Sequence, residues 1–282
     1  MGPRREGTFA VMTPFYAPWL DADTASAYGA FCRHFGLYRK GSEELARLVD
    51  LGRARTVLDL ACGTGSTTRV VLSRIAEDAA VIAADVSPAM LDEARRTIDD
   101  PRVRWVEAAA EEVDRYVTAT VDVALCSAAI WQTELERTFP AVRRLMRSGG
   151  ALAFDIAGAF VEVPEAASRL PAASLASAYM DAAAELYELE PGRRRRSPYT
   201  VEAIRGLLQA ASFELHTVRV VDLEASPEEM RAWLEIPIFN DRFGGRLTHE
   251  QRAAALALAW ERQADDRPRE VVRDVCFAAT AR

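Results

Sequence analysis

The most informative part of this sequence is Val57-Leu58-Asp59-Leu60-Ala61-Cys62-Gly63-Thr64-Gly65, an apolar run that ends in two closely spaced glycines. Such a run is typical of a buried strand. The glycines predict a tight turn whose main-chain N–H groups can approach a ligand, because neither residue carries a Cβ. Ser66 and Thr67 follow the turn and predict a helix whose positive end faces the same place.

A second apolar run, residues 80–84, ends at Asp85, about twenty residues after the glycines. A carboxylate at this spacing can accept hydrogen bonds from both hydroxyls of a ribose. The glycine turn and Asp85 together predict a site for an adenosine-containing cofactor.

Two residues distinguish this site from a dinucleotide-binding fingerprint. Thr68 stands where that fingerprint carries its third glycine. Asp59, ahead of Gly63, would repel a diphosphate and attract a cation. A nicotinamide-linked oxidoreductase is therefore the disfavoured alternative.

The segments Asp59 to Gly65 and Ala83-Ala84-Asp85-Val86-Ser87-Pro88-Ala89-Met90 resemble the first two motifs of class I S-adenosylmethionine (SAM) dependent methyltransferases. The resemblance runs from Val57 to about Ile156 and includes a strand near residues 121–127 and the turn 147–150 before a further strand. It implies a Rossmann-like α/β fold, with a doubly wound, mostly parallel seven-stranded sheet. It also implies SAM as cofactor and methyl transfer to a small molecule, with O-methylation favoured over N- or C-methylation.

The same resemblance implies how the cofactor is held. Asp59 would face the methionyl amino group, and the main chain around Ala61, Gly63 and Gly65 would surround the methionine. Asp85 would hold the ribose. The other implied contacts are with the adenine ring or the sulfonium, and they come from Val86, Met90, Ala110, Glu111 and Ser127.

Ala109 departs from the family pattern, in which many relatives carry an aspartate that contacts the adenine amino group. Glu111 or a main-chain carbonyl would then supply that acceptor.

Methyl transfer from a sulfonium needs alignment of donor and acceptor and exclusion of water. A base helps where the acceptor must lose a proton. His34 is the candidate base, with a surface or core role as its alternative, and Tyr38 is a second candidate at the catalytic site. Four aromatic residues are candidate walls of the substrate pocket, with packing of a cap onto the core as the alternative: Tyr16, Trp19, Trp131 and Phe160.

The four consecutive arginines from Arg193 to Arg196 allow two interpretations. They can form a solvated loop before a helix. Alternatively, they can capture a carboxylate or phosphate on the acceptor, because guanidinium groups match such oxygens in pairs. The acceptor is expected to be aromatic or anionic.

The chain alternates predicted strands and helices, which indicates a parallel sheet covered on both faces. We expect a helical arm at residues 1–40, with helices at 23–38 and 43–51 nearby, and a SAM-binding core at 41–157. A helical lid is expected at 158–198. The rest of the core is expected at 199–282, with a helical insertion at about 226–266.

Charge and cysteine content narrow the classes of partner. The formal net charge of −7 disfavours a nucleic-acid binder, which would present a basic face. Four scattered cysteines indicate neither a metal site nor a disulfide framework, and suit a reducing cytoplasm. No signal peptide or membrane span is expected, and a homodimer is compatible with the sequence.

The other alternative to a methyltransferase is a regulatory protein that binds SAM without catalysis.

Overall fold

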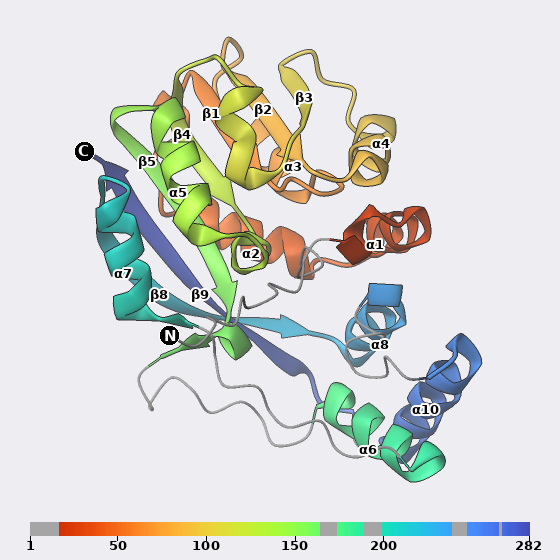
Figure 1. Ribbon diagram of the computed structural model, residues 1–282. Coiled ribbons are helices and arrows are strands. Elements are labelled where there is room, and N and C mark those ends of the chain that lie inside the picture. Colours follow the sequence, from red (N-terminus) through yellow and green to blue (C-terminus); the bar gives the residue numbers. More distant parts are fainter. Residues whose placement is uncertain (1–16, 164–173, 189–198, 239–246, 265–266) are drawn as a thin grey trace, which may run out of the picture.

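The computed structural model describes residues 17–163, 174–188, 199–238, 247–264 and 267–282. Within these ranges, seven strands form one sheet in the order β3-β2-β1-β4-β5-β9-β8 (Figure 1). The strands β1 to β5 are parallel, and β9 lies antiparallel between β5 and β8. This confirms the predicted doubly wound, mostly parallel sheet. The seven strands are β1 (Thr56–Leu60), β2 (Ala80–Asp85), β3 (Val103–Glu107), β4 (Val121–Cys126), β5 (Met146–Ala157), β8 (Phe213–Ala225) and β9 (Glu270–Ala281).

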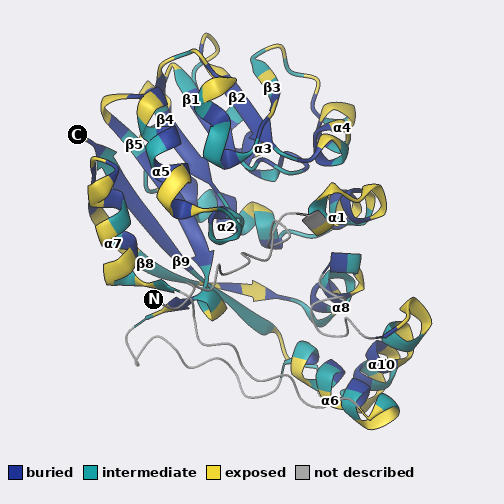
Figure 2. Cartoon of the chain, viewed as in Figure 1, coloured by how far each residue is buried: buried dark blue, intermediate teal, exposed yellow. Residues whose placement is uncertain are grey.

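Helices cover both faces of the sheet, because successive residues of each strand point to opposite sides. On one face, Leu45 of α2 (Leu37–Ala46) and Val71 of α3 (Ser66–Leu72) belong to the same buried cluster as Val57 of β1. On the other, Phe139 of α5 (Leu135–Leu145) and Leu208 of α7 (Val201–Ala210) belong to the cluster of the central strands. Figure 2 shows the sheet buried between these layers, which explains the uninterrupted apolar runs.

A third hydrophobic cluster lies beyond the far ends of β8 and β9 (Figure 1). It joins α6 (Leu175–Tyr187), α8 (Pro227–Glu235) and α10 (His249–Arg262) to α1 (Ala22–His34), with Tyr179 and Leu234 fully buried within it. Two short strands, β6 (Val161–Glu162) and β7 (Tyr199–Thr200), pair separately. The remaining short elements are α4 (Pro88–Thr97), η1 (Ala17–Leu20), η2 (Leu51–Arg53), η3 (Ala110–Arg115), η4 (Ile130–Gln132) and η5 (Gly158–Phe160).

Three predicted elements were wrong. The helix expected over residues 23–38 is two helices, because Phe35 adopts an extended conformation (φ −114°, ψ 158°) between them. The separate helix expected at residues 43–51 is not observed with those bounds, because α2 begins at Leu37 and ends at Ala46. The turn expected at residues 147–150 lies inside β5, which begins at Met146 and shifts its register against β4 between Val121 and Val123.

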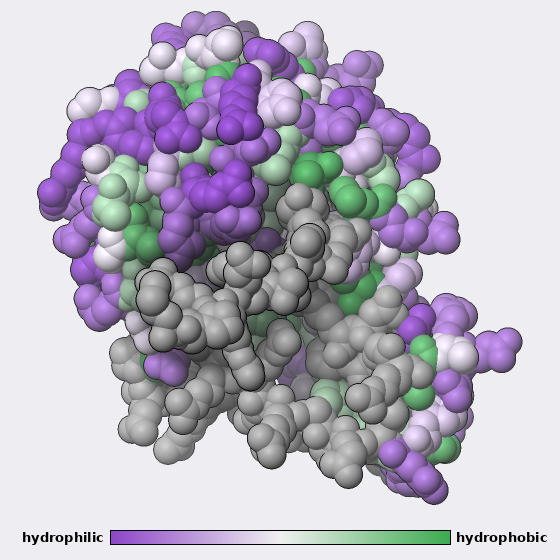
Figure 3. Space-filling model, in the orientation of Figure 1, coloured by the Kyte–Doolittle hydropathy of each residue, from purple (hydrophilic) through white to green (hydrophobic). Residues whose placement is uncertain are grey.

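The surface is strongly polar over the helices that flank the sheet (Figure 3). Among the described helices, none combines the length and the apolar character that crossing a bilayer requires.

Candidate functional site

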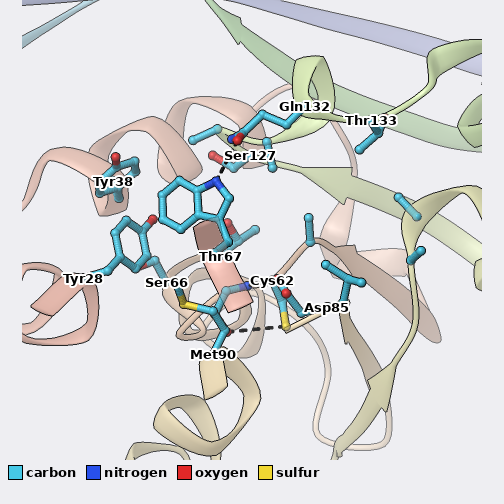
Figure 4. Close-up of a pocket in the computed structure, with 18 of the residues that line it drawn as sticks. Tyr28, Tyr38, Cys62, Ser66, Thr67, Asp85, Met90, Ser127, Gln132 and Thr133 are labelled. Carbon is cyan, nitrogen blue, oxygen red and sulfur yellow. Dashed lines mark hydrogen bonds between the residues drawn. The ribbon is translucent and has the colours of Figure 1, made fainter. Parts of the chain in front are cut away.

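A cavity opens at the carboxyl ends of β1, β2 and β4, as expected for a sheet of this topology. The space between its walls, counted together with the open solvent at its mouth, is about 890 Å³. Side chains from several elements converge on it (Figure 4). Ten of the residues predicted for the site line the cavity: Trp19, Tyr38, Ala61, Gly63, Asp85, Val86, Met90, Ala110, Glu111 and Ser127.

The turn between β1 and α3 contains three residues in the left-handed region. Gly63 (φ +53°) and Gly65 (φ +88°) adopt it without a steric penalty, whereas Ala61 (φ +54°) carries a Cβ. Gly65 lies outside the cavity lining, and a Cβ there would overlap the end of the Ile98 side chain. Gly63 therefore shapes the cavity, and Gly65 allows α3 to pack closely against the residues that follow α4.

Asp85 joins the end of β2 to the glycine turn. Its Oδ2 accepts a hydrogen bond from the Gly63 N–H at 2.8 Å, and its Oδ1 accepts one from the Ser87 N–H, also at 2.8 Å. Burial raises the pKa of this carboxyl, and the hydrogen bonds from the main chain oppose that rise. Asp85 is thus a buried acid that fixes the turn and also lines the cavity.

Asp59 lies outside the cavity lining. Its Oδ2 accepts a 2.6 Å hydrogen bond from Thr68 Oγ1, and its Oδ1 is buried without a hydrogen-bond partner among the described residues. Burial, with a smaller contribution from the Asp85 charge, raises the pKa of Asp59 to about 7. Asp59 therefore lies outside the cavity lining and is bonded to α3. Its predicted contact with a methionyl amino group stays a prediction.

Three aromatic rings stand on one side of the cavity. Trp19 and Tyr28 meet edge to face with centroids 5.5 Å apart, and Tyr28 and Tyr38 meet at 4.9 Å. Trp19 also bridges to the opposite wall, because its Nε1 donates a 2.7 Å hydrogen bond to Gln132 Oε1. Figure 4 shows Tyr28 and Tyr38 on one side of the cavity and Asp85 on the other.

Residues 57–150 match the family profile described as a methyltransferase domain. A protein of Saccharomyces cerevisiae, named as a probable S-adenosylmethionine-dependent methyltransferase, CRG1, is 35% identical over 121 residues, or 41% of this chain and 40% of that protein. A trans-aconitate 2-methyltransferase of Azoarcus is 31% identical over 42% of this chain and 45% of that protein. A malonyl-[acyl-carrier protein] O-methyltransferase of Acetivibrio thermocellus is 28% identical over 48% of this chain and 46% of that protein.

The match thus spans less than half the length of these three curated relatives. Among solved structures, the SAM complex of Haemonchus contortus phosphoethanolamine N-methyltransferase 2 superimposes with a TM-score of 0.56, at 16% identity, over 98% of this chain and 60% of that one. The cyclase SpnF also superimposes, with a TM-score of 0.52 at 17% identity, over 86% of this chain and 81% of that one. Likeness at this level of identity shows the fold alone.

Residues 57–150 of this chain thus resemble the methyltransferase domain of class I SAM-dependent methyltransferases. The cofactor of this family is S-adenosylmethionine, as the motifs in the sequence implied.

Sequence reasoning did not identify Asp155, which lies behind Ser127 in the cavity wall. Its Oδ2 accepts a 2.9 Å hydrogen bond from Ser127 Oγ, and its Oδ1 accepts a 2.7 Å bond from the Ala128 N–H. Burial raises the pKa of Asp155 to about 6, and burial together with the Asp155 charge raises that of Asp274 to about 8. The sequence feature that could have identified Asp155 is the presence of an acidic residue inside the apolar run of β5.

Tyr28, Gln132 and Thr133 also line the cavity and were missed. Tyr28 lies in α1, where the sequence pattern predicts which residues are buried but not which residues they contact. Gln132 and Thr133 lie after β4, where no motif marks them. Glu111 does line the cavity, and one of its oxygens already accepts a 2.8 Å hydrogen bond from the Glu134 N–H.

Several predicted residues lie elsewhere. His34 lines a neighbouring hollow with Cys32 and Arg33 rather than this cavity. Trp131 and Phe160 stack on each other at 5.7 Å and pack against the sheet core instead of lining the cavity. Tyr16 and the arginines 193–196 are outside the described residues. Among the described residues, no group of three His, Cys, Asp or Glu side chains is arranged to hold a metal.

Proposed function

We propose that this chain transfers the methyl group of SAM to an oxygen atom of a small-molecule acceptor. The observation that carries the proposal is the convergence of Gly63, Asp85 and Ser127 on one cavity, inside the segment that matches the methyltransferase profile. The family match supports the cofactor. The place of the cavity at the carboxyl ends of the strands, and its concave shape, support a small acceptor.

The charges around the cavity fit this cofactor. Among the described lining residues, the side chains that are charged near neutral pH are acidic, Asp85 and Glu111, and none is Lys, Arg or His. Such a cavity suits a nucleoside with a positively charged sulfur and disfavours a diphosphate. The cofactor, when bound, supplies an electrophilic methyl group.

The residues of the chain would then bind and orient the two reactants. We assign the ribose hydroxyls to Asp85, whose carboxylate is already fixed by two main-chain N–H groups. Val86 and Met90 would offer apolar surface to the adenine, with Ala110 and Glu111 at its other edge. Trp19, held across the mouth by Gln132, would exclude water from the reacting atoms.

Two observations favour oxygen as the methyl acceptor. The relatives include a malonyl-[acyl-carrier protein] O-methyltransferase and a trans-aconitate 2-methyltransferase, whose named substrates are carboxylic acids. In this chain, Ser127, Gln132 and Thr133 place hydroxyl and amide groups on the wall formed by the end of β4. These groups can orient an acceptor oxygen by hydrogen bonds.

The test is incubation of the purified chain with methyl-labelled SAM and a panel of small carboxylic acids, phenols, alcohols and amines. Label recovered in an ester or ether supports the proposal. Label confined to amines would replace O-methylation by N-methylation. Tight SAM binding with no transfer to any class would favour a binding protein without catalysis.

A further inference from the structure

A buried acid on β5 stands directly behind the polar wall of the cavity. The Ser127 side chain lines the cavity (Figure 4), and its Oγ donates a 2.9 Å hydrogen bond to Asp155 Oδ2. A hydroxyl has one hydrogen and two lone pairs, so Ser127 Oγ can still accept a hydrogen bond from a group in the cavity. Ser127 therefore connects the cavity to a carboxylate that does not itself line it.

The same carboxylate holds the main chain that follows Ser127. Asp155 Oδ1 accepts a 2.7 Å hydrogen bond from the Ala128 N–H, and Ala128 adopts a left-handed conformation at φ +56°. A residue with a Cβ is strained in this conformation, and such strain persists where the surrounding structure maintains it, often at functional sites. Asp155 thus fixes both the hydroxyl of Ser127 and the backbone beside it before any ligand binds.

The surroundings of Asp155 make it a base suited to neutral pH. The carboxyl is buried, and within the described part of the chain no arginine or lysine forms an ion pair with it. Burial raises the pKa of Asp155 to about 6, because the charged form loses its contact with water. A base whose pKa lies close to the working pH is the most effective in proton transfer.

The groups around Asp155 leave it as the first buried acid of its cluster to ionise as the pH rises. They come from β4, β8, β9 and α2, and they are Cys126, Arg219, Asp274, Cys276 and Glu44. Burial raises the pKa of both thiols, so they stay uncharged near neutral pH. Burial and the Asp155 charge raise the pKa of Asp274 to about 8, so Asp274 is still protonated when Asp155 ionises. Arg219 and Glu44 pair with each other at 2.8 Å.

We propose that Ser127 relays a proton from a phenolic hydroxyl of the acceptor to Asp155 during methyl transfer. The inference rests on the proposed function, and it adds the class of acceptor. A carboxylic acid is already ionised near neutral pH and needs no base, whereas a phenol, with an ordinary pKa of about 10, is protonated there.

The relay moves two protons in one step. The acceptor O–H bond breaks and its proton joins Ser127 Oγ, while the Ser127 proton joins Asp155 Oδ2. The acceptor oxygen forms its bond to the methyl carbon as the carbon–sulfur bond breaks and leaves its electron pair on sulfur. After the products leave, the proton returns from Asp155 through Ser127 to water in the cavity.

The first test offers the full chain methyl-labelled SAM with phenols in one set and with carboxylic acids and alcohols in another. Label should pass to the phenols. Transfer only to acceptors without a phenolic hydroxyl would overturn the relay while the proposed O-methylation stands. Transfer to neither set would remove the proposed function, and the relay with it.

A pH profile with the phenol that takes label fastest separates proton transfer from a structural role. In the parent protein, kcat/KM should rise with pH to a plateau above an inflection near pH 6. Asp155→Asn keeps an acceptor for the Ala128 N–H but cannot take a proton, so kcat should fall about 100-fold or more and the inflection should disappear. The loss should shrink as the pH approaches about 10, because an ionised phenol needs no base.

Ser127→Ala interrupts the relay with Asp155 still in place and should lower kcat to a similar extent. Asp274→Asn is the matched control, because it changes a neighbouring acid that does not line the cavity. It should keep both kcat and the inflection. Calorimetric titration should give all three variants the SAM affinity of the parent, which shows that the site is folded. Full activity in Ser127→Ala, or an equal loss at every pH in Asp155→Asn, would contradict the relay.

Discussion

The Thr68 hydroxyl donates a buried 2.6 Å hydrogen bond to the Asp59 carboxylate, and this bond joins α3 to β1, the two elements that the glycine turn connects. Replacing Thr68 by Val removes the hydroxyl donor from this buried carboxyl, and only the hydrogen bond from the Thr68 main chain remains. We expect Thr68→Val to lower the free energy of unfolding by about 1 to 3 kcal/mol. Urea denaturation monitored by circular dichroism would measure it, and an unchanged midpoint would contradict the assigned bond.

The same carboxyl predicts a pH dependence of stability. Its folded pKa of about 7 lies above the ordinary value of 3.8. The folded state therefore binds more protons than the unfolded state between these values, and the contribution of Asp59 to stability is lost as pH rises toward 7. The stability of wild type relative to Asp59→Asn should fall between pH 4 and pH 7. A constant difference across denaturation curves in this range would show that Asp59 does not titrate there.

The buried pair Asp155 and Asp274 predicts a further pH dependence of stability, at higher pH than that of Asp59. The Asp274 pKa of about 8 is raised by burial and by the neighbouring Asp155 charge. Its folded pKa again exceeds the ordinary value, so stability is lost as pH rises through about 8. Asp274→Asn should therefore gain stability over wild type at pH 9 relative to pH 6. Thermal unfolding at the two pH values tests this, and a gain that is the same at both would contradict the paired ionisation.

Ala61 predicts a stabilising substitution. At φ +54° its Cβ costs roughly 1 to 2 kcal/mol, whereas glycine adopts this conformation freely. Glycine also raises the entropy of the unfolded chain, which offsets about 0.4 to 1 kcal/mol. Ala61→Gly should therefore raise the free energy of unfolding by up to about 1 kcal/mol.

Ala80→Gly is the control for that substitution, because Ala80 is an exposed strand residue with a normal φ. It should lose about 0.5 to 1 kcal/mol of stability. The same sign for both variants in chemical denaturation would argue against strain at Ala61.

Asp85 carries the binding prediction. Asp85→Ala should weaken SAM binding by about 1 to 3 kcal/mol, because the ribose hydroxyls lose a charged partner. Asp92→Ala on the outer surface of α4, where Asp92 pairs with Arg95, should leave the affinity unchanged. Calorimetry on both variants gives the comparison, and an unaltered affinity in Asp85→Ala would remove the ribose assignment.

The gathering of Gly63, Asp85 and Ser127 at one cavity could be predicted from sequence, because parallel strands bring their carboxyl ends to the same edge of the sheet. The positions of Asp59 and Gly65 could not. Asp59 lies inside β1, and a bond to Thr68 on α3 holds it below the turn, while Gly65 is set by its contact with Ile98. Both depend on tertiary packing, which the motif does not encode.

The aromatic wall was equally hidden in the sequence. Tyr28 and Tyr38 meet only because the chain breaks at Phe35, so that α1 and α2 turn toward each other instead of continuing as one helix. Gln132 can be assigned to the site only from its hydrogen bond with Trp19, a residue that is distant in sequence. Contacts of this kind follow from the angle between helices and not from local pattern.

A crystal structure of the chain soaked with SAM tests the central claim most directly. The account predicts the ribose hydroxyls within hydrogen-bond distance of Asp85 and the adenine against Val86 and Met90. SAM bound away from the glycine turn, or with its ribose remote from Asp85, would contradict it.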